Sequence, residues 1–218
     1  MPGSREAADR VVTTDVLVVG SEGAGARAAI EAASRGARVL LVTKGNGIGR
    51  SGATITAHVS NMAVDSRSAT RQLGLAGDEG DGPEAFFEDI VVEGKYVNDQ
   101  RQVQAVVEEL PARARELAEW GLKWEKLIGP SPGHRFPRSC YARGGTGPAM
   151  LRAMKRAIAS LPAIRVVPDV MVTDLLTADG RVTGAVGVEL KKGEYWAFSA
   201  KAVILATGGG QHVFPRVA

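Results

Sequence analysis

The chain has 218 residues, of which 44% are hydrophobic and 23% charged, as in globular proteins and unlike disordered chains. Its 27 Lys and Arg against 24 Asp and Glu leave a formal net charge of +3, too small a surplus to indicate a nucleic-acid-binding protein. No apolar run reaches the roughly 18 residues of a membrane span, so we expect no transmembrane segment. One cysteine, Cys140, excludes an internal disulfide framework and fits a reducing compartment such as the cytoplasm.

The first predicted elements form a βαβ unit. Residues 1–13 read as an N-terminal tail, and residues 14–19 (TDVLVV) as a short buried strand. An Ala-rich helix over 24–35 ends at Gly36, and residues 38–43 (RVLLVT) form a second strand. Strand, glycine turn, helix and strand in succession predict parallel pairing with a right-handed crossover.

The middle of the chain is predicted to be a helical insertion. Residues 61–83 are polar and rich in glycine, which favours a long loop. Helices are predicted over 83–93, 98–110 and 113–120, with Asn98 as N-cap and Pro111 separating the last two. Residues 129–147 form another loop, and residues 148–160 a further helix.

The last third changes to the two-residue period of strands. Residues 170–176, 181–190 and 195–198, joined by turn signals, predict a small antiparallel meander. A short buried strand over 202–205 then ends at Ala206-Thr207-Gly208. The predicted fold is therefore α/β, with a Rossmann-like parallel βαβ core, a small antiparallel meander and a helical insertion.

The turn after the first strand indicates dinucleotide binding. Its glycine fingerprint has Gly20, Glu22 and Gly25 in the three glycine positions, and it opens a helix whose first amides can hold a pyrophosphate. Glu22 replaces the glycine that permits close approach, so its side chain must turn away from the phosphates, toward a ribose hydroxyl. The alternative is an ordinary tight turn, but the position between strand and helix favours the nucleotide site.

The end of the second strand argues against an NAD-dependent dehydrogenase. The acidic residue that would bind the ribose of NAD is absent, and Thr43-Lys44 stands there instead. The following stretch, residues 45–54 (GNGIGRSGAT), offers backbone amides, Arg50 and hydroxyl groups to a phosphate chain. Its alternative interpretation is a flexible surface loop.

These segments together resemble a known family. DVLVVGSEGAGARAAIEAA over 15–33, VTKG over 42–45, GRSGAT over 49–54 and AKAVILATGGG over 200–210 are similar to the FAD-binding start of fumarate reductase, succinate dehydrogenase and L-aspartate oxidase flavoproteins. The similarity runs from about residue 14 to residue 216. It implies a FAD-binding domain over 14–218, with cofactor contacts from Gly20, Ser21, Glu22, Gly23, Ala24, Gly25, Thr43, Lys44, Ser51, Gly52, Ala53, Thr54, Val170, Met171, Ala206, Thr207 and Gly208.

The resemblance also carries expectations about cofactor attachment and activity. Members that bind FAD covalently use a histidine at the position of Ala53, so noncovalent FAD is expected. Val59 and Ser60, beside His58, depart from the family's pattern. The implied reaction is hydride transfer between FAD and a dicarboxylate, with an iron–sulfur subunit as possible partner and cytoplasmic localisation, membrane association arising only through partner subunits.

The family's capping and C-terminal helical domains, with their substrate-binding residues, are not found in these 218 residues. We therefore expect an incomplete FAD-binding domain that does not reduce fumarate alone. A non-catalytic fragment and an L-aspartate oxidase-like protein remain the alternative interpretations.

Catalytic and metal-binding residues cannot be assigned from the sequence. His134, Arg135 and Arg138 form a basic cluster on a predicted loop, which either attracts an anionic substrate or is an ordinary solvated loop. His212 follows the last strand and could reach a cofactor. Cys140 has no partner at metal-ligand spacing, and the dispersed histidines predict no metal site.

Overall fold

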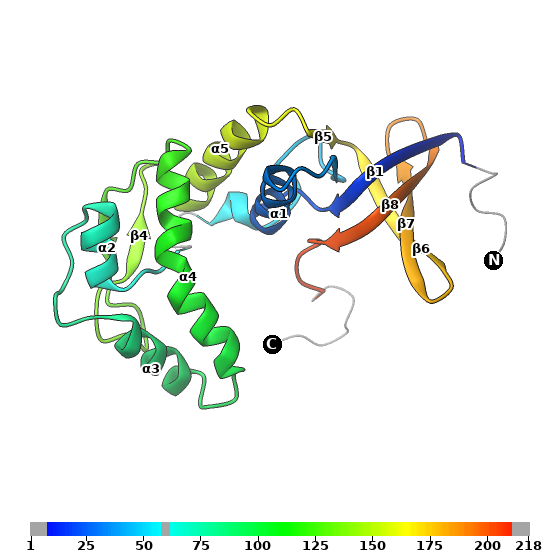
Figure 1. Cartoon of the computed structure of the whole chain (residues 1–218). Helices are drawn as coiled ribbons and strands as arrows, with labels where there is room; N and C mark the ends of the chain where they lie inside the picture. The colour runs from blue at the N-terminus through cyan, green and yellow to red at the C-terminus, as the bar shows by residue number, and fades with distance from the viewer. Residues whose placement is uncertain (1–7, 58–61, 211–218) are drawn as a thin grey trace. The chain divides into compact units, whose positions relative to one another are not determined.

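The computed structural model describes residues 8–57 and 62–210, which form two compact units (Figure 1). The first unit combines residues 1–55 with residues 154–218, and the second comprises residues 56–153. The second unit is thus inserted in sequence between two stretches that fold together.

The first unit is built on a six-stranded sheet. The strand order is β5-β2-β1-β8-β7-β6, in which the first four strands are parallel and β8, β7 and β6 are antiparallel. The bounds are β1 Arg10–Val19, α1 Gly23–Ser34, β2 Val39–Val42, β5 Ile164–Val167, β6 Val170–Ala178, β7 Arg181–Glu189 and β8 Tyr195–Leu205. The structure confirms the predicted α/β class, with a parallel core extended by an antiparallel meander.

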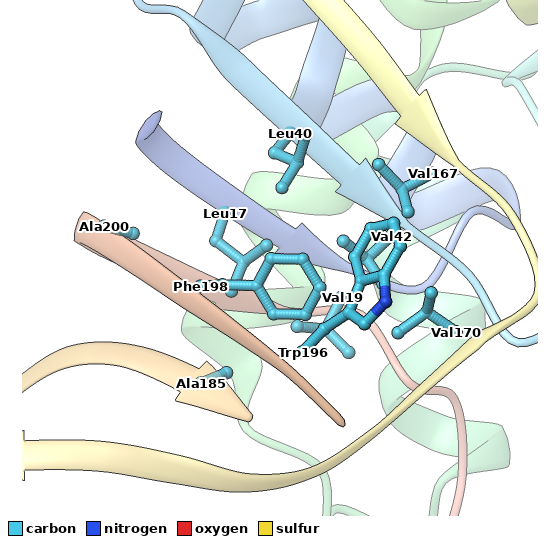
Figure 2. Close-up of a cluster of buried hydrophobic side chains, with 10 residues drawn as sticks. All are labelled: Leu17, Val19, Leu40, Val42, Val167, Val170, Ala185, Trp196, Phe198 and Ala200. Carbon is cyan, nitrogen blue, oxygen red and sulfur yellow. The ribbon is translucent and has the colours of Figure 1, made fainter. Parts of the chain in front are cut away.

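Side chains pack against the central strands of this sheet in two groups. On one face an apolar cluster surrounds Trp196 and Phe198, whose ring centroids lie 6.1 Å apart (Figure 2). Residues 196, 198 and 200 of β8 and residues 17 and 19 of β1 contribute to this cluster, as the two-residue period of strands requires. Helix α1 packs against β1 and β2 through its buried alanines and Ile30. All four residues of β2 are consequently buried.

The second unit is mainly helical. It contains α2 Ser66–Leu73, α3 Pro83–Glu93, α4 Gln100–Glu119 and a small hairpin of β3 Lys126–Ile128 and β4 Ser139–Tyr141. Phe86, Val91, Val103 and Val107 form its apolar cluster between α3 and α4. Helix α5 Thr146–Ala159 begins in this unit and ends in the first, and the short 3-10 helix η1 Thr54–Thr56 spans the other boundary.

Several predicted elements of the helical unit are corrected. The predicted loop over 61–83 contains α2, whose N-cap Asp65 accepts a hydrogen bond from the Ser68 amide and whose C-cap Gly74 has φ +67°. Helix α4 continues through Pro111, so this proline does not separate two helices. The N-cap of α4 is Asp99 rather than Asn98, since the Asn98 side-chain amide donates to the Ile90 carbonyl. The hairpin of β3 and β4 was not predicted, and α5 begins two residues early.

In the sheet, three strand predictions differ from the structure. Strand β1 begins at Arg10 instead of residue 14. The two strands predicted over 195–198 and 202–205 are one strand, β8, which pairs with β7 on one side and β1 on the other. The edge strand β5 was not predicted from the sequence.

Candidate functional site

The chain leaves β1 through the glycine turn, and the backbone of this turn has a conformation that only glycine adopts easily. Gly20 has φ +104°, and a Cβ there would lie 2.2 Å from the Ala206 carbonyl oxygen. At Gly25 a Cβ would lie 1.8 Å from the Gly20 carbonyl oxygen, so this glycine lets α1 approach the turn closely. The Gly20 amide donates to the Val42 carbonyl at 2.8 Å. The turn is therefore fixed between the ends of β1, β2 and β8.

The N-terminus of α1 opens beside this turn, and its N-cap residue does not cap it with its side chain. The N-cap Glu22 makes no side-chain capping hydrogen bond, and the first turn contains no acidic residue. The positive end of the helix dipole is thus left uncompensated by the helix's own side chains, which suits an anionic group.

Glu22 points toward the loop that follows β2. Its Oε1 accepts hydrogen bonds from the Gly52 amide at 3.0 Å and the Ser51 amide at 3.4 Å. A Cβ at Gly52 would lie 2.3 Å from the Glu22 Cγ, so the side chain lies directly against this glycine. The partner of Glu22 in the protein is therefore the backbone of the loop, and the ribose hydroxyl expected from the sequence stays a prediction.

Thr43 and Ser51 connect the end of β2 with the same loop. Thr43 is buried, its Oγ1 accepts from the Gly45 amide at 3.3 Å, and its Oγ1 lies 3.3 Å from the Ser51 Oγ. Lys44, the next residue, is exposed. The loop after β2 is therefore held by specific hydrogen bonds rather than being a free surface loop.

A cavity of about 520 Å³ lies where these segments meet, at the carboxyl ends of β1, β2 and β8. It is lined by every cofactor residue predicted from the sequence except Gly25 and Gly52, which pack behind the lining. Ligands of open α/β sheets bind at this edge of the strands. Arg50, which the sequence offered as a phosphate ligand, is exposed and does not line the cavity.

Four lining residues were not predicted from the sequence: Val19, Val42, Val172 and Leu205. Three of them are the last residues of β1, β2 and β8. The rule that ligands bind at carboxyl ends of parallel strands would have identified these three. Val172 could not be found this way, because it lies inside the antiparallel strand β6.

The basic cluster of the helical unit is bound to carboxylates. The Arg138 Nε and Nη2 donate to Asp81 at 2.9 and 2.7 Å, and its Nη1 donates to Asp89 at 2.7 Å. Arg135 donates to Asp89 and to Glu88, both at 2.6 Å. These ion pairs neutralise the arginines, so the cluster does not provide an uncompensated cationic site for an anionic substrate.

His134 completes this network as a neutral acceptor. Its Nδ1 lies 2.9 Å from the Arg138 Nη1, and because a guanidinium can only donate, Nδ1 accepts. Burial and the neighbouring Arg138 cation lower the pKa of His134. Burial alone would raise the pKa of Asp81, but hydrogen bonds from Arg138 and the Ser66 amide outweigh it and lower that pKa.

The other reactive side chains of the described residues are not arranged as a reactive site. Burial raises the pKa of the Cys140 thiol to about 12, which keeps this thiol protonated and unreactive. Among residues 8–57 and 62–210, no group of three His, Cys, Asp or Glu side chains could hold a metal ion. His58, Val59, Ser60 and His212 lie outside the described residues.

In the described part of the chain, none of the helices has both the length and the apolar character needed to cross a bilayer.

Comparison with known proteins agrees with this geometry. A family described as "FAD binding domain" matches residues 15–218. The fumarate reductase (CoM/CoB) of Methanothermobacter marburgensis has a subunit that is 37% identical over 207 residues, which are 92% of this chain and 36% of that protein. The L-aspartate oxidase of Streptomyces coelicolor is 33% identical over 93% of this chain and 34% of its own length.

Solved structures show the same relationship. The apo form of the Mycobacterium smegmatis Sdh1 complex contains a chain that is 32% identical with a TM-score of 0.81, covering 92% of this chain and 35% of that one. A flavocytochrome c3 fumarate reductase in its open conformation has a TM-score of 0.80 at 30% identity, covering 94% of this chain and 35% of its own. The chain thus spans about a third of the length of its relatives. It belongs to the FAD binding domain family and corresponds to the N-terminal, FAD-binding part of fumarate reductase and succinate dehydrogenase-type flavoproteins.

Proposed function

We propose that the cavity at the carboxyl ends of β1, β2 and β8 is the FAD site of this protein. The observation that carries this proposal is the N-terminus of α1, which opens beside the cavity with no capping hydrogen bond from its N-cap Glu22 and no acidic residue in its first turn. Such a terminus favours an anion, and the diphosphate of FAD is the anion that the family's cofactor supplies.

Each part of the lining has a proposed role toward the dinucleotide. The turn from Gly20 to Gly25 binds the diphosphate through backbone amides and the α1 dipole. Thr43 and Lys44 hold the adenosine ribose region, and the backbone at Val170 and Met171 faces the adenine. The segment Ser51, Gly52, Ala53 and Thr54 borders the flavin, and Ala206, Thr207 and Gly208 bring β8 back to the cofactor.

The proposed attachment of FAD is noncovalent. Ala53 lines the cavity at the position where covalent members of the family carry a histidine, and its methyl side chain cannot form that bond. Acid treatment should therefore release all flavin from the protein.

The activity that we propose is a flavin-dependent oxidation or reduction of a dicarboxylate. Bound FAD would supply hydride chemistry, while the protein positions the cofactor and excludes competing reactions. Support comes from relatives named as fumarate reductases and an L-aspartate oxidase. We assign no catalytic residue, because the basic cluster of the helical unit is already paired with carboxylates.

We further propose an electron-transfer partner and a cytoplasmic location. Several relatives are named as flavoprotein subunits or were solved as complexes, which supports an iron–sulfur subunit as partner and membrane association through partner subunits. The single cysteine, which is buried and free, fits a reducing compartment.

The substrate class can be tested on FAD-loaded protein reduced chemically in the absence of oxygen. Because the family's substrate-binding residues are not found in these 218 residues, we expect artificial dyes but not fumarate to return the oxidised flavin spectrum. Return of that spectrum on adding fumarate, but not on adding a monocarboxylate, would support the proposed dicarboxylate and contradict the expectation that these residues alone do not reduce it.

The FAD site can be tested with Gly23→Asp. A Cβ at Gly23 would make only ordinary contacts, 3.4 Å from the Thr54 Oγ1, and an acidic residue at a helix N-terminus stabilises the helix. The new charge would face the diphosphate, so we expect at least about 100-fold weaker FAD binding by calorimetric titration, with undiminished thermal stability of the apo-protein.

Gln100→Asp is the matched control. It adds the same charge at the exposed start of α4, in the unit that does not line the cavity, and should bind FAD like the wild type. If Gly23→Asp binds FAD as tightly as this control, the diphosphate does not lie at the start of α1.

A further inference from the structure

Four hydrogen bonds attach the segment from Gly49 to Thr54 to the glycine turn. The Gly49 amide donates to the Ser21 carbonyl at 3.3 Å, and the Gly23 amide donates to the Thr54 Oγ1 at 3.2 Å. Between these two contacts, the amides of Ser51 and Gly52 both donate to the Oε1 of Glu22. Glu22 is the only side chain of the turn that takes part, so it is the part of this attachment that a substitution can remove.

This attachment determines the position of a cavity wall. Ser51, Ala53 and Thr54 line the cavity together with Glu22, and Gly52 packs against the Glu22 side chain. The wall and the turn come from residues about 30 positions apart in the sequence. Their relative position is therefore set by contacts across the cavity rim and not by chain connectivity.

The charge of Glu22 makes its presence costly in a site for an anionic cofactor. Its Oε2 is buried with no hydrogen-bond partner, and no lysine or arginine of the described chain forms an ion pair with it. A carboxylate near a diphosphate is repelled, so Glu22 requires a compensating role. Hydrogen bonds to a charged acceptor are about twice as strong as neutral ones, which makes a carboxylate an effective clamp for two backbone amides.

We propose that Glu22 is a positioning residue that clamps the wall Ser51–Thr54 against the glycine turn and thereby shapes the FAD cavity. The inference rests on the proposed FAD site. It assigns to Glu22 a role that strengthens FAD binding, whereas repulsion between its carboxylate and the diphosphate would by itself weaken that binding. Removal of the clamp lets the wall move, so cofactor contacts weaken even though a negative charge has been taken away.

Two variants separate clamping from repulsion. Glu22→Gln removes the charge but keeps an oxygen that can accept from the Ser51 and Gly52 amides, whereas Glu22→Ala removes both. Clamping predicts that Glu22→Ala binds FAD at least about tenfold more weakly than wild type, while Glu22→Gln stays within about threefold of it. Repulsion predicts instead that both variants bind FAD more tightly.

The experiment is calorimetric titration of apo-protein with FAD, alongside thermal unfolding of each apo-protein. Glu31→Gln is the matched control, because Glu31 lies on the same helix, outside the cavity lining, and loses the same charge. Weak binding by Glu22→Ala that is restored in Glu22→Gln supports the proposal. If Glu22→Ala does not fold, Glu22→Leu takes its place, because leucine is also neutral but cannot accept from the two amides. Binding of FAD by Glu22→Leu that is as tight as by Glu22→Gln would overturn the clamp.

The outcomes also separate this inference from the proposed FAD site. Wild-type protein that fails to bind FAD would overturn both. Wild-type protein that binds FAD, together with Glu22 variants of equal or greater affinity, would overturn the clamp alone.

Discussion

Arg138 is among the largest fully buried side chains of the protein, and its environment explains how a charge is kept there. Its guanidinium lies 4.7 Å from the centre of the Phe86 ring and 5.5 Å from that of Phe136, while Asp81 and Asp89 accept its hydrogen bonds. The Arg138 cation thus pairs with two buried carboxylates, one just before α3 and one within it, and connects them with the residue that precedes β4. Removing the guanidinium, or both carboxylates, would leave a buried charge without its partner, which destabilises a protein strongly.

We predict that Arg138→Met destabilises the helical unit by about 3–5 kcal/mol, because it leaves the Asp81 carboxylate buried without a cation and leaves Asp89 with Arg135 as its cation. The free energy of unfolding is measured by urea titration of proteins that also carry Trp196→Phe, with tryptophan fluorescence as the signal. The remaining tryptophans, Trp120 and Trp124, both lie in this unit. Arg115→Met, which removes an exposed ion pair with Glu119, should cost less than about 1 kcal/mol. Equal costs for the two variants would show that the buried network contributes no more than a surface pair.

At the scale of single residues, most of the cavity lining was predictable but the buried network was not. The glycine turn and its flanking strands are close in sequence, so spacing alone locates Gly20, Glu22 and Gly25. Arg138 and its partners are 49 and 57 positions apart, and nothing in the local pattern indicates that these polar residues are buried. An arginine in a Gly- and Pro-rich stretch is ordinarily exposed, so the sequence favoured a solvated loop.

The elements show a similar division between local and long-range causes. The βαβ unit and the meander follow from apolar runs and turn residues, whereas α2 lacks an apolar stripe and depends on its caps, Asp65 and Gly74. Strand β8 was divided in the prediction because residues 199–201 break the apolar run. In the structure, continuous pairing with β1 keeps these residues in one strand.

Gly184 of β7 is the element-scale position that we expect to tolerate least change. It pairs with Ser199 of β8, and a Cβ there would lie 1.8 Å from the Phe198 carbonyl oxygen. Gly184→Ala should lower the free energy of unfolding of the sheet by about 3 kcal/mol or more, since backbone atoms must separate. Trp196 fluorescence during urea unfolding reports the loss.

Gly193→Ala is the comparison for this prediction. Gly193 has φ +75° in the turn between β7 and β8, with nothing within 4 Å of an added Cβ, so only its conformation is strained. We expect a cost of about 1–2 kcal/mol. A larger loss in Gly193→Ala than in Gly184→Ala would mean that close backbone packing is not what requires glycine in β7.

For the whole molecule, the sequence predicted the fold class and the insertion but not the division into two units. One FAD-binding domain was expected over residues 14–218, which stays a prediction, and the cavity lining comes entirely from the unit formed by residues 1–55 and 154–218. Sequence patterns identify elements, but they do not show that two distant stretches make more contacts with each other than with the segment between them.

This division predicts that FAD stabilises one unit selectively. With free FAD at about 100 times its dissociation constant, the unfolding free energy of the unit that binds it should rise by about 2.7 kcal/mol. Trp196 reports this unit once Trp120 and Trp124 are replaced by phenylalanine, and the reverse replacement reports the helical unit. An equal shift of both transitions would show that the two units unfold together.

The position of β8 in the sheet has a consequence for biosynthesis. This strand is the last of the described strands in the chain, yet it lies between β1 and β7, and its start is held near Asp9 by a contact spanning 186 positions. During translation, the edge of β1 that pairs with β8 stays unpaired until residues 195–205 have left the ribosome. Exposed strand edges promote aggregation of nascent chains, so molecular chaperones should be needed in this interval.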